Sequence, residues 1–172
     1  GPTLYTPSEI CVARYTSAGA LDPAFGSFGI FRMAAPVGSA NLRALALDGT
    51  KIVAAGSCGA DGAQDFCVLR LNANGTPDTT FGGTGLAIAP VGTLDDQAYA
   101  LAIDGTRILV AGECEVTGST NTCLARFNAD GSLDGTFGSG GKAIHALSTI
   151  QDGAYALTII GGQAYAGGRC GP

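Results

Sequence analysis

Apolar and polar residues alternate over short stretches of the chain, and this alternation has the two-residue period of a β-strand. Residues 99–103 alternate in this way, and an Asp104-Gly105 step joins them to an apolar run at 107–111. An Asp-Gly step between two apolar runs predicts a tight β-hairpin with positive φ at both turn positions. Two more strands are expected at residues 123–127 and 142–147. Together the four segments predict a four-stranded antiparallel sheet.

The same pattern occurs three times at one fixed spacing, which is the separation of Cys11 from Cys67 in the sequence, so the chain is an internal repeat. Six cysteines mark the frame in two evenly spaced series: Cys11, Cys67 and Cys123, then Cys58, Cys114 and Cys170. We therefore divide the chain into repeats at 3–58, 59–114 and 115–170, within a single β domain at 3–172. The leading Gly1-Pro2 resembles the remnant of a cleaved tag and is set aside.

The spacing of the cysteines predicts disulfides. Cys58 and Cys67 bracket a short loop, as do Cys114 and Cys123, and each pair is expected to join two adjacent strands. The remaining cysteines occupy the same repeat positions at the two chain ends, which predicts a third bond, Cys11–Cys170. No pair has the short spacing of a zinc site, and the chain has a single His. A disulfide framework favours an oxidising compartment, outside the cell or on its surface.

The residues of the second strand, 108–111, are apolar on both faces, so this strand should be covered on both sides. Sheets arranged around an axis achieve this, as in β-propellers. We therefore predict an all-β fold of three four-stranded antiparallel repeats, β-propeller-like, with a β-prism or β-trefoil as the alternative. The third sheet would take two strands from each chain end, a "velcro" closure. We favour closure within one chain as a monomer ring, with a head-to-tail dimer of two chains as the alternative.

Two kinds of segment resemble the delta-60 repeat family. The first is Leu71-Asn-Ala-Asn-Gly-Thr-Pro-Asp78 with the following Phe81-Gly82, and it recurs at residues 127–138. The second is the stretch LAIDGTRILVAG at residues 101–112. That family consists of bacterial, mostly secreted or surface-attached, β-propeller repeats. The resemblance therefore implies a propeller fold and a surface location, and it brings no catalytic residues with it.

Charge and hydropathy narrow the choice of partner. Charged residues make up only 13% of the chain, the net charge is −5, and no cluster of Lys and Arg occurs. A phosphate backbone would be repelled, so nucleic acid is not expected as a partner. No apolar stretch is long enough to cross a bilayer, so membrane insertion is not expected either.

Several polar patterns suggest chemistry, but each has a simpler structural interpretation. The runs Asn72/Asn74/Asp78 and Asn128/Asp130/Asp134 resemble part of a calcium loop but lack its terminal Glu, so we interpret them as Asx turns. Three arginines recur with three aspartates and are expected to pair with them: Arg14 with Asp22, Arg70 with Asp78, and Arg126 with Asp134. His145 occurs without a nucleophile motif and is interpreted as a strand surface residue. Asp95-Asp96 and Glu113/Glu115 are interpreted as solvated loop carboxylates rather than a glycosidase pair.

The loops between the paired cysteines, and the connections before the first strand of each repeat, differ most among the repeats. Function tends to be carried by loops on a rigid scaffold. The candidate ligand contacts are therefore Tyr5, Asp65, Asp95, Asp96 and Asn121. No catalytic residue, metal or cofactor is predicted.

These observations favour a non-enzymatic, extracellular binding or adhesion module of a bacterial surface or fibre protein, which recognises a glycan or another cell-surface polymer. The alternatives are a structural module that docks a protein partner, and a glycan-acting hydrolase, which would need two carboxylates converging in one cleft.

Overall fold

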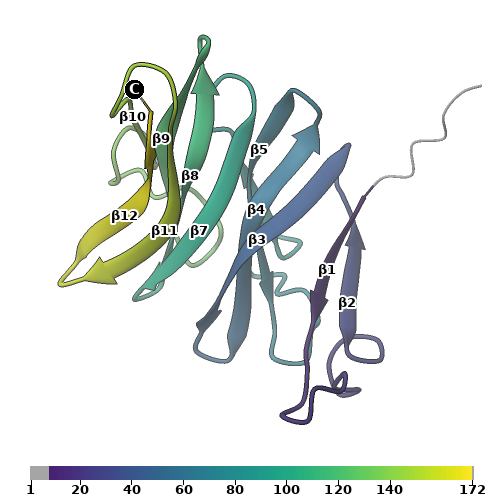
Figure 1. Cartoon of the computed structure of the whole chain (residues 1–172). Coiled ribbons are helices and arrows are strands. Elements are labelled where there is room, and N and C mark those ends of the chain that lie inside the picture. Colours follow the sequence, from purple (N-terminus) through teal and green to yellow (C-terminus); the bar gives the residue numbers. More distant parts are fainter. Residues whose placement is uncertain (1–7, 172) are drawn as a thin grey trace, which may run out of the picture.

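The computed structural model describes residues 8–171, and these residues form twelve β-strands in four antiparallel sheets (Figure 1). Two sheets have four strands each, and we call them the complete sheets. The first contains β3 (Ser39–Asp48), β4 (Lys51–Ala60), β5 (Ala63–Leu71) and β6 (Leu86–Ala89). The second contains β7 (Asp96–Asp104), β8 (Arg107–Val116), β9 (Ser119–Phe127) and β10 (Lys142–His145). The predicted all-β fold is confirmed.

The other two sheets have two strands each, and we call them the end half-sheets. One pairs β1 (Glu9–Ala13) with β2 (Ile30–Ala34), and the other pairs β11 (Asp152–Ile160) with β12 (Gln163–Cys170). Within the described residues, no helix is long and apolar enough to cross a membrane.

The two complete sheets have the same register, offset by one repeat. Leu45 pairs with Ala54 in the first, and Leu101 pairs with Val110 in the second. Both also have a bulge at equivalent positions of the first strand, between Leu42 and Ala44 and between Ala98 and Ala100. The repeat of the sequence is therefore also a repeat of the hydrogen-bonded ladder.

The first hairpin of each complete sheet turns one residue later than the Asp-Gly pattern predicted. Asp104 pairs with Arg107, so the two central turn residues are Gly105 and Thr106. Only Gly105 has positive φ, at 60°, which suits a turn that needs Gly at its first central position. The Asp instead ends the strand.

The apolar core lies between neighbouring sheets rather than inside any one of them. Val53 and Ala55 of β4 share one buried cluster with Ile108 and Val110 of β8. Leu109 faces the other side of β8 and is also buried, at 3% exposure. The prediction that this strand is covered on both faces is confirmed, and it explains why residues 108–111 show no polar alternation.

The four sheets form a row, and the end half-sheets lie at opposite ends of it (Figure 1). The β1–β2 half-sheet packs against the first complete sheet, where the Gly26 N–H donates to the Asn74 carbonyl at 2.8 Å. The β11–β12 half-sheet packs against the second, with β11 beside β7. Each half-sheet therefore packs against the complete sheet next to it in the sequence, and the two complete sheets separate the two half-sheets. The expected ring within one chain is not seen in the described residues.

Two of the three predicted disulfides are present. Cys58 bonds to Cys67 across β4 and β5, and Cys114 bonds to Cys123 across β8 and β9, with Cα–Cα distances of 5.7 and 5.8 Å. Cys11 and Cys170 are free and exposed. The predicted Cys11–Cys170 bond is absent because β1 and β12 lie in the two half-sheets at opposite ends of the row.

Candidate functional site

The first strands of the successive sheets, β3, β7 and β11, lie side by side along one edge of the row (Figure 1). Equivalent positions on these strands carry Arg43, Tyr99 and Tyr155, which we call the inner-strand ladder. The Arg43 guanidinium carbon lies 5.1 Å from the centroid of the Tyr99 ring. The rings of Tyr99 and Tyr155 meet edge to face, with centroids 5.0 Å apart and planes at 78°. Three sheets thus contribute side chains to one continuous line of contacts, which consists of a guanidinium and two aromatic rings.

A carboxylate on β8 holds both tyrosines of the ladder. Glu113 accepts hydrogen bonds from the hydroxyl of Tyr99 and, at 3.5 Å, from the hydroxyl of Tyr155. Burial and the neighbouring Glu113 carboxylate raise the pKa of Tyr99 well above its usual range, so its hydroxyl remains a donor at every physiological pH. Tyr155 is 45% exposed, so it is partly open to solvent.

A chain of planar amides continues from the ladder toward the first complete sheet. The Gln97 Oε1 accepts from Arg43 Nη2 at 3.0 Å and from Ser57 Oγ at 3.3 Å. The Gln97 Nε2 donates to Gln64 Oε1 at 2.7 Å, and Gln64 Nε2 donates to Ser39 Oγ at 2.6 Å. These bonds fix the orientation of Arg43 and Gln97. The result is a preorganised surface of aromatic rings, a guanidinium and amides.

The predicted ligand contacts Asp95 and Asp96 instead accept hydrogen bonds from backbone N–H groups. Asp96 is fully buried, and its carboxylate accepts from the N–H groups of Val91 at 2.6 Å and Gly92 at 3.0 Å. Burial raises the pKa of Asp96 to about 6, although these hydrogen bonds oppose the shift. Asp95 accepts from the Gln64 N–H at 2.9 Å. Our interpretation of Asp96 as solvated was wrong, because its connection folds back over the carboxylate.

The other predicted contacts do not gather at the inner-strand ladder. Asp65 lies half-buried on β5, and burial raises the pKa of its carboxyl. Asn121 lies within β9 and is buried, at 7% exposure. Tyr5 lies outside the described residues. Asp95 is therefore linked to the amide chain through the Gln64 N–H. The Asp65 carboxylate lies close enough to Asp96 to contribute to the raised pKa of Asp96.

The repeated polar patterns have the predicted structural roles. All three arginines bond through Nε to their aspartates: Arg14–Asp22 at 2.9 Å, Arg70–Asp78 at 2.7 Å and Arg126–Asp134 at 2.8 Å. The Asx turns are also confirmed, since Asn74 Oδ1 accepts from the Thr76 N–H and Asp130 Oδ1 from the Ser132 N–H. His145 lies exposed on β10, as predicted. Among the described residues, no group of three His, Cys, Asp or Glu side chains is arranged to hold a metal ion.

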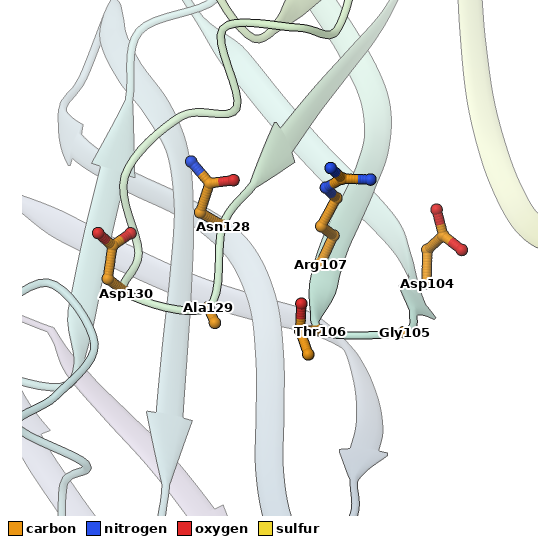
Figure 2. Close-up of a pocket in the computed structure, with 7 residues that line it drawn as sticks. All are labelled: Asp104, Gly105, Thr106, Arg107, Asn128, Ala129 and Asp130. Atoms are coloured by element: carbon orange, nitrogen blue, oxygen red, sulfur yellow. The ribbon is translucent and has the colours of Figure 1, made fainter.

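A second surface feature lies at the opposite end of the second complete sheet. An open depression of about 720 Å³ is lined by the β7–β8 turn, including Asp104 and Arg107, and by the turn containing Asn128 and Asp130 (Figure 2). Two of its three charged groups already have internal partners, because Arg107 Nε bonds to Asp134 at 3.0 Å and Asp130 caps its own turn. We interpret it as a gap between two structural turns.

Comparison with protein families gives two matches to one family model, described as "Domain of unknown function (DUF5122) beta-propeller", at residues 51–81 and 107–137. These matches support a β-propeller repeat family. They lie one repeat apart and cover the β4–β5 and β8–β9 hairpins with the turns that follow. The third equivalent segment would begin at Gln163 in β12 and end at Phe25, so it is divided between the two chain ends. No curated protein and no solved structure matches the chain.

Sequence reasoning missed the inner-strand ladder. Its three members stand directly before Ala44-Leu45, Ala100-Leu101 and Ala156-Leu157, which are identical in all repeats. A position that changes from Arg to Tyr beside an unchanged pair is a signal that could have identified it. The sequence could not show that strands of three different sheets lie next to one another.

Proposed function

We propose that the chain is a non-enzymatic, extracellular binding module that recognises a glycan or a comparable surface polymer through the inner-strand ladder. The observation that supports this most is the exposed Tyr155, which is continued by Tyr99 and Arg43. An aromatic ring with fixed polar neighbours is the usual composition of a small-ligand site.

The chemistry of the ladder suits a sugar better than a charged ligand. The ladder and its supporting carboxylate carry one cation, Arg43, and one anion, Glu113, so their formal charges cancel, and both groups are already hydrogen-bonded, Arg43 to Gln97 and Glu113 to the two tyrosines. Tyr rings offer an apolar face with a polar edge. The amide of Gln97 and the guanidinium of Arg43 offer donors and acceptors in fixed planes. A polyhydroxylated ring presents C–H faces and hydroxyl edges that complement both.

The wider architecture supports a surface location. The two disulfides are consistent with an oxidising, extracellular compartment. We also propose that the repeats are propeller blades of the delta-60 type, which would place the ladder where the blades approach the propeller axis. In that position one ligand chain could contact several blades, as adhesion to a polymer requires.

The test is a screen of immobilised bacterial glycans and cell-envelope polysaccharides, followed by calorimetry on any that bind. Tyr155→Ala should weaken binding at least tenfold, because it removes the exposed aromatic side chain. Phe28→Ala is the matched control, since Phe28 is an exposed aromatic side chain, at 84%, outside the inner strands. It should leave the affinity unchanged.

Two results would reject this function. One is the absence of binding to every glycan tested by a chain whose fold is intact. The other is equal loss of binding in Tyr155→Ala and Phe28→Ala, because the contact would then not involve the ladder. Release of new reducing ends during incubation would instead favour the hydrolase alternative.

A second candidate, a module that docks another protein, is favoured by a different observation. The end half-sheets expose apolar side chains that the complete sheets bury, including Tyr15 at 63% and Tyr165 at 53%. Neither Tyr15 nor Tyr165 is a member of the ladder, although Tyr155 lies in the same half-sheet as Tyr165.

A further inference from the structure

We propose that a second copy of this chain completes the missing third sheet. The free edge of β12 would pair antiparallel with the free edge of β1 from the second copy, and Cys170 would form a disulfide with Cys11 of that copy. The reciprocal junction would form at the other end of each chain. The result is a closed, covalent ring of two chains.

The complete sheets specify the register of this junction. Gly56 pairs with Cys67 and Cys58 with Asp65 in the β4–β5 ladder, and Gly112 pairs with Cys123 and Cys114 with Asn121 in the β8–β9 ladder. The next members of the series, one repeat further on, pair Gly168 with Cys11 and Cys170 with Glu9 of the second copy. This is the relative placement from which both existing disulfides form, with Cα–Cα distances of 5.7 and 5.8 Å.

The exposure of β12 shows that a neighbour is missing. Tyr165 is 53% exposed, whereas its counterparts Val53 and Leu109 are 0% and 3% exposed. Cys170 is exposed, whereas Cys58 and Cys114 are buried. Residues 164–168 of β12 are Ala, Tyr, Ala, Gly and Gly, without a charged side chain, as expected of a strand in the middle of a sheet.

The free edge of β1, at the other end of the chain, also lacks a neighbouring strand. Tyr15 is 63% exposed, whereas its counterparts Leu71 and Phe127 are 0% and 1% exposed. Cys11 is exposed, whereas Cys67 and Cys123 are buried. The half-sheet β1–β2 supplies the third and fourth strands of a sheet, and β11–β12 supplies the first and second. The two are therefore the complementary halves of one sheet rather than two similar edges.

A hollow lies beside each free edge, where the missing strand would fit. The hollow beside β1 has a volume of about 260 Å³ and is lined by Cys11, Ala13, Leu42 and Ala54 among others. The hollow beside β12 is smaller, about 80 Å³, and Thr122 lines it with Gly168 and Cys170. The Thr122 hydroxyl is buried and has no hydrogen-bond partner among the described residues. A buried unpaired hydroxyl facing an open edge is what a missing neighbour would leave.

A backbone contact between sheets extends the series once more. The Gly26 N–H donates to the Asn74 carbonyl, and the Gly82 N–H donates to the Asp130 carbonyl, both at 2.8 Å. The next members, again one repeat further on, are the Gly138 N–H and the Ala18 carbonyl, and Ala18 belongs to the opposite chain end. In the proposed ring Gly138 would donate to Ala18 of the second copy.

The number of copies follows from the geometry of propellers, which contain four to eight blades. One chain supplies only three blades. Two chains supply four complete sheets and two completed at the junctions, six in all. Head-to-tail contacts give a closed ring when the rotation closes, and an open filament when it does not.

The covalent step needs an oxidant, and we assign this role to a small-molecule disulfide of the kind found in oxidising compartments. The Cys170 thiolate attacks that disulfide, forms a mixed disulfide and releases one small thiol. The Cys11 thiolate of the second copy then attacks the Cys170 sulfur and releases the second thiol. One protein disulfide forms and one small disulfide is reduced to two thiols, which take up two protons in place of the two that the cysteines lose to solvent, so no proton is released overall.

The experiment uses the full chain, reduced and then reoxidised in a glutathione redox buffer as an equal mixture of ¹⁴N- and ¹⁵N-labelled protein. We expect a mass of twice the 17.0 kDa chain under non-reducing conditions. We also expect a Cys11–Cys170 cross-linked peptide that carries one light and one heavy half in about half of its copies, as random pairing of two chains requires. Reduction should break the disulfides between the two chains and leave a non-covalent dimer, which dissociates on dilution.

Three outcomes would overturn the proposal: cross-linked peptides with both halves always of the same label, which means closure within one chain; monomers with two free thiols; or a ladder of masses beyond the dimer, which means an open filament.

Complementary variants provide the matched control. Cys11→Ser and Cys170→Ser replace exposed side chains and should both fold, which circular dichroism can verify. Neither alone can form the Cys170–Cys11 bond, whereas an equal mixture of the two should give a dimer with one such bond. If the mixture forms no more disulfide dimer than either variant alone, the proposed pairing is wrong.

Discussion

The complete sheets and the end half-sheets are made from the same repeat, yet their side chains have opposite environments. Cys114 in β8 is buried, and Cys170, at the same position in β12, is exposed. Arg70 has a side chain 4% exposed beside Asp78, whereas the side chain of Arg14 is 37% exposed beside Asp22. The comparison shows that burial in this fold comes from neighbouring sheets and neighbouring strands, and not from the residues of a repeat alone.

The first contrast concerns the repeated ion pair. Arg70→Ala removes the Nε partner of the buried Asp78 carboxylate, which keeps Lys51 as its other cation, and should cost about 1.5–3 kcal/mol of unfolding free energy. Arg14→Ala removes the same bond at a half-exposed pair and should cost less than about 1 kcal/mol. Urea unfolding of the reduced chain measures both. Equal costs would show that the end half-sheet is as well packed as the complete one.

The second contrast compares equivalent strand positions. Leu109→Ala should cost about 2–5 kcal/mol because it opens a cavity beside a side chain that is 3% exposed. Tyr165→Ala, at the equivalent position of β12, should change the stability of the monomer by less than about 0.5 kcal/mol. In the proposed dimer the same Tyr165→Ala change should weaken association. A large loss in the isolated monomer would contradict the open edge.

The third contrast concerns the cysteines. Replacement of Cys114 and Cys123 together by Ser should cost about 2–3 kcal/mol, the value expected for a short closed loop. Replacement of Cys11 and Cys170 together should leave monomer stability unchanged, because both are free there. Thermal unfolding in the absence of reductant, at a concentration where the chain is monomeric, distinguishes the two. Equal effects would mean that Cys11 and Cys170 already form a bond.

The smallest effect is electrostatic and compares two equivalent aspartates. Burial raises the pKa of Asp96 to about 6. Burial would also raise the pKa of Asp152, but hydrogen bonds from Ser148 and Leu147 outweigh it, so its pKa lies below the usual value. Because the folded-state pKa of Asp96 exceeds its unfolded value, its contribution to stability is complete below about pH 4 and lost as the pH rises through about 6. The folded-state pKa of Asp152 lies below its unfolded value, so its contribution to stability is present above the unfolded pKa and is lost as the pH falls.

Carboxyl ¹³C titration by NMR measures both aspartates directly, and Asp96→Asn should remove the stability change between about pH 4 and 6. Formation of the dimer should raise the pKa of Asp152, because a completed sheet removes more water around it. Identical titration of the two aspartates in the monomer would contradict the difference in their surroundings.

Much of the local structure could be predicted from the sequence. The strands around Tyr99, Ile108 and Cys123, the three Arg–Asp pairs and the two short-range disulfides all depend on residues close together in the chain or repeated at one spacing. The hairpin turn was misplaced by one residue, because the Asp-Gly pattern does not distinguish a turn centred on Asp104 from one centred on Gly105. The prediction for Asp96 was wrong because its burial depends on a connection that folds back over it.

The candidate site was the least predictable part. The sequence pattern indicates Asp96 and Asn121 as loop ligands, but both are buried, and it does not single out the exposed Tyr155. Contacts such as Tyr99 with Tyr155 join strands of different sheets, and their distance depends on how the sheets pack.

The repeat, the strand order within it and the pairing of cysteines inside each hairpin all follow from the sequence alone, because periodicity and short loops leave few alternatives. The placement of the two halves of the third sheet at opposite ends of the row does not follow from it and emerges only when the sheets are packed. The reason is physical: one repeat specifies how each sheet packs on the next, but closure depends on the accumulated rotation over all sheets, which no single position encodes.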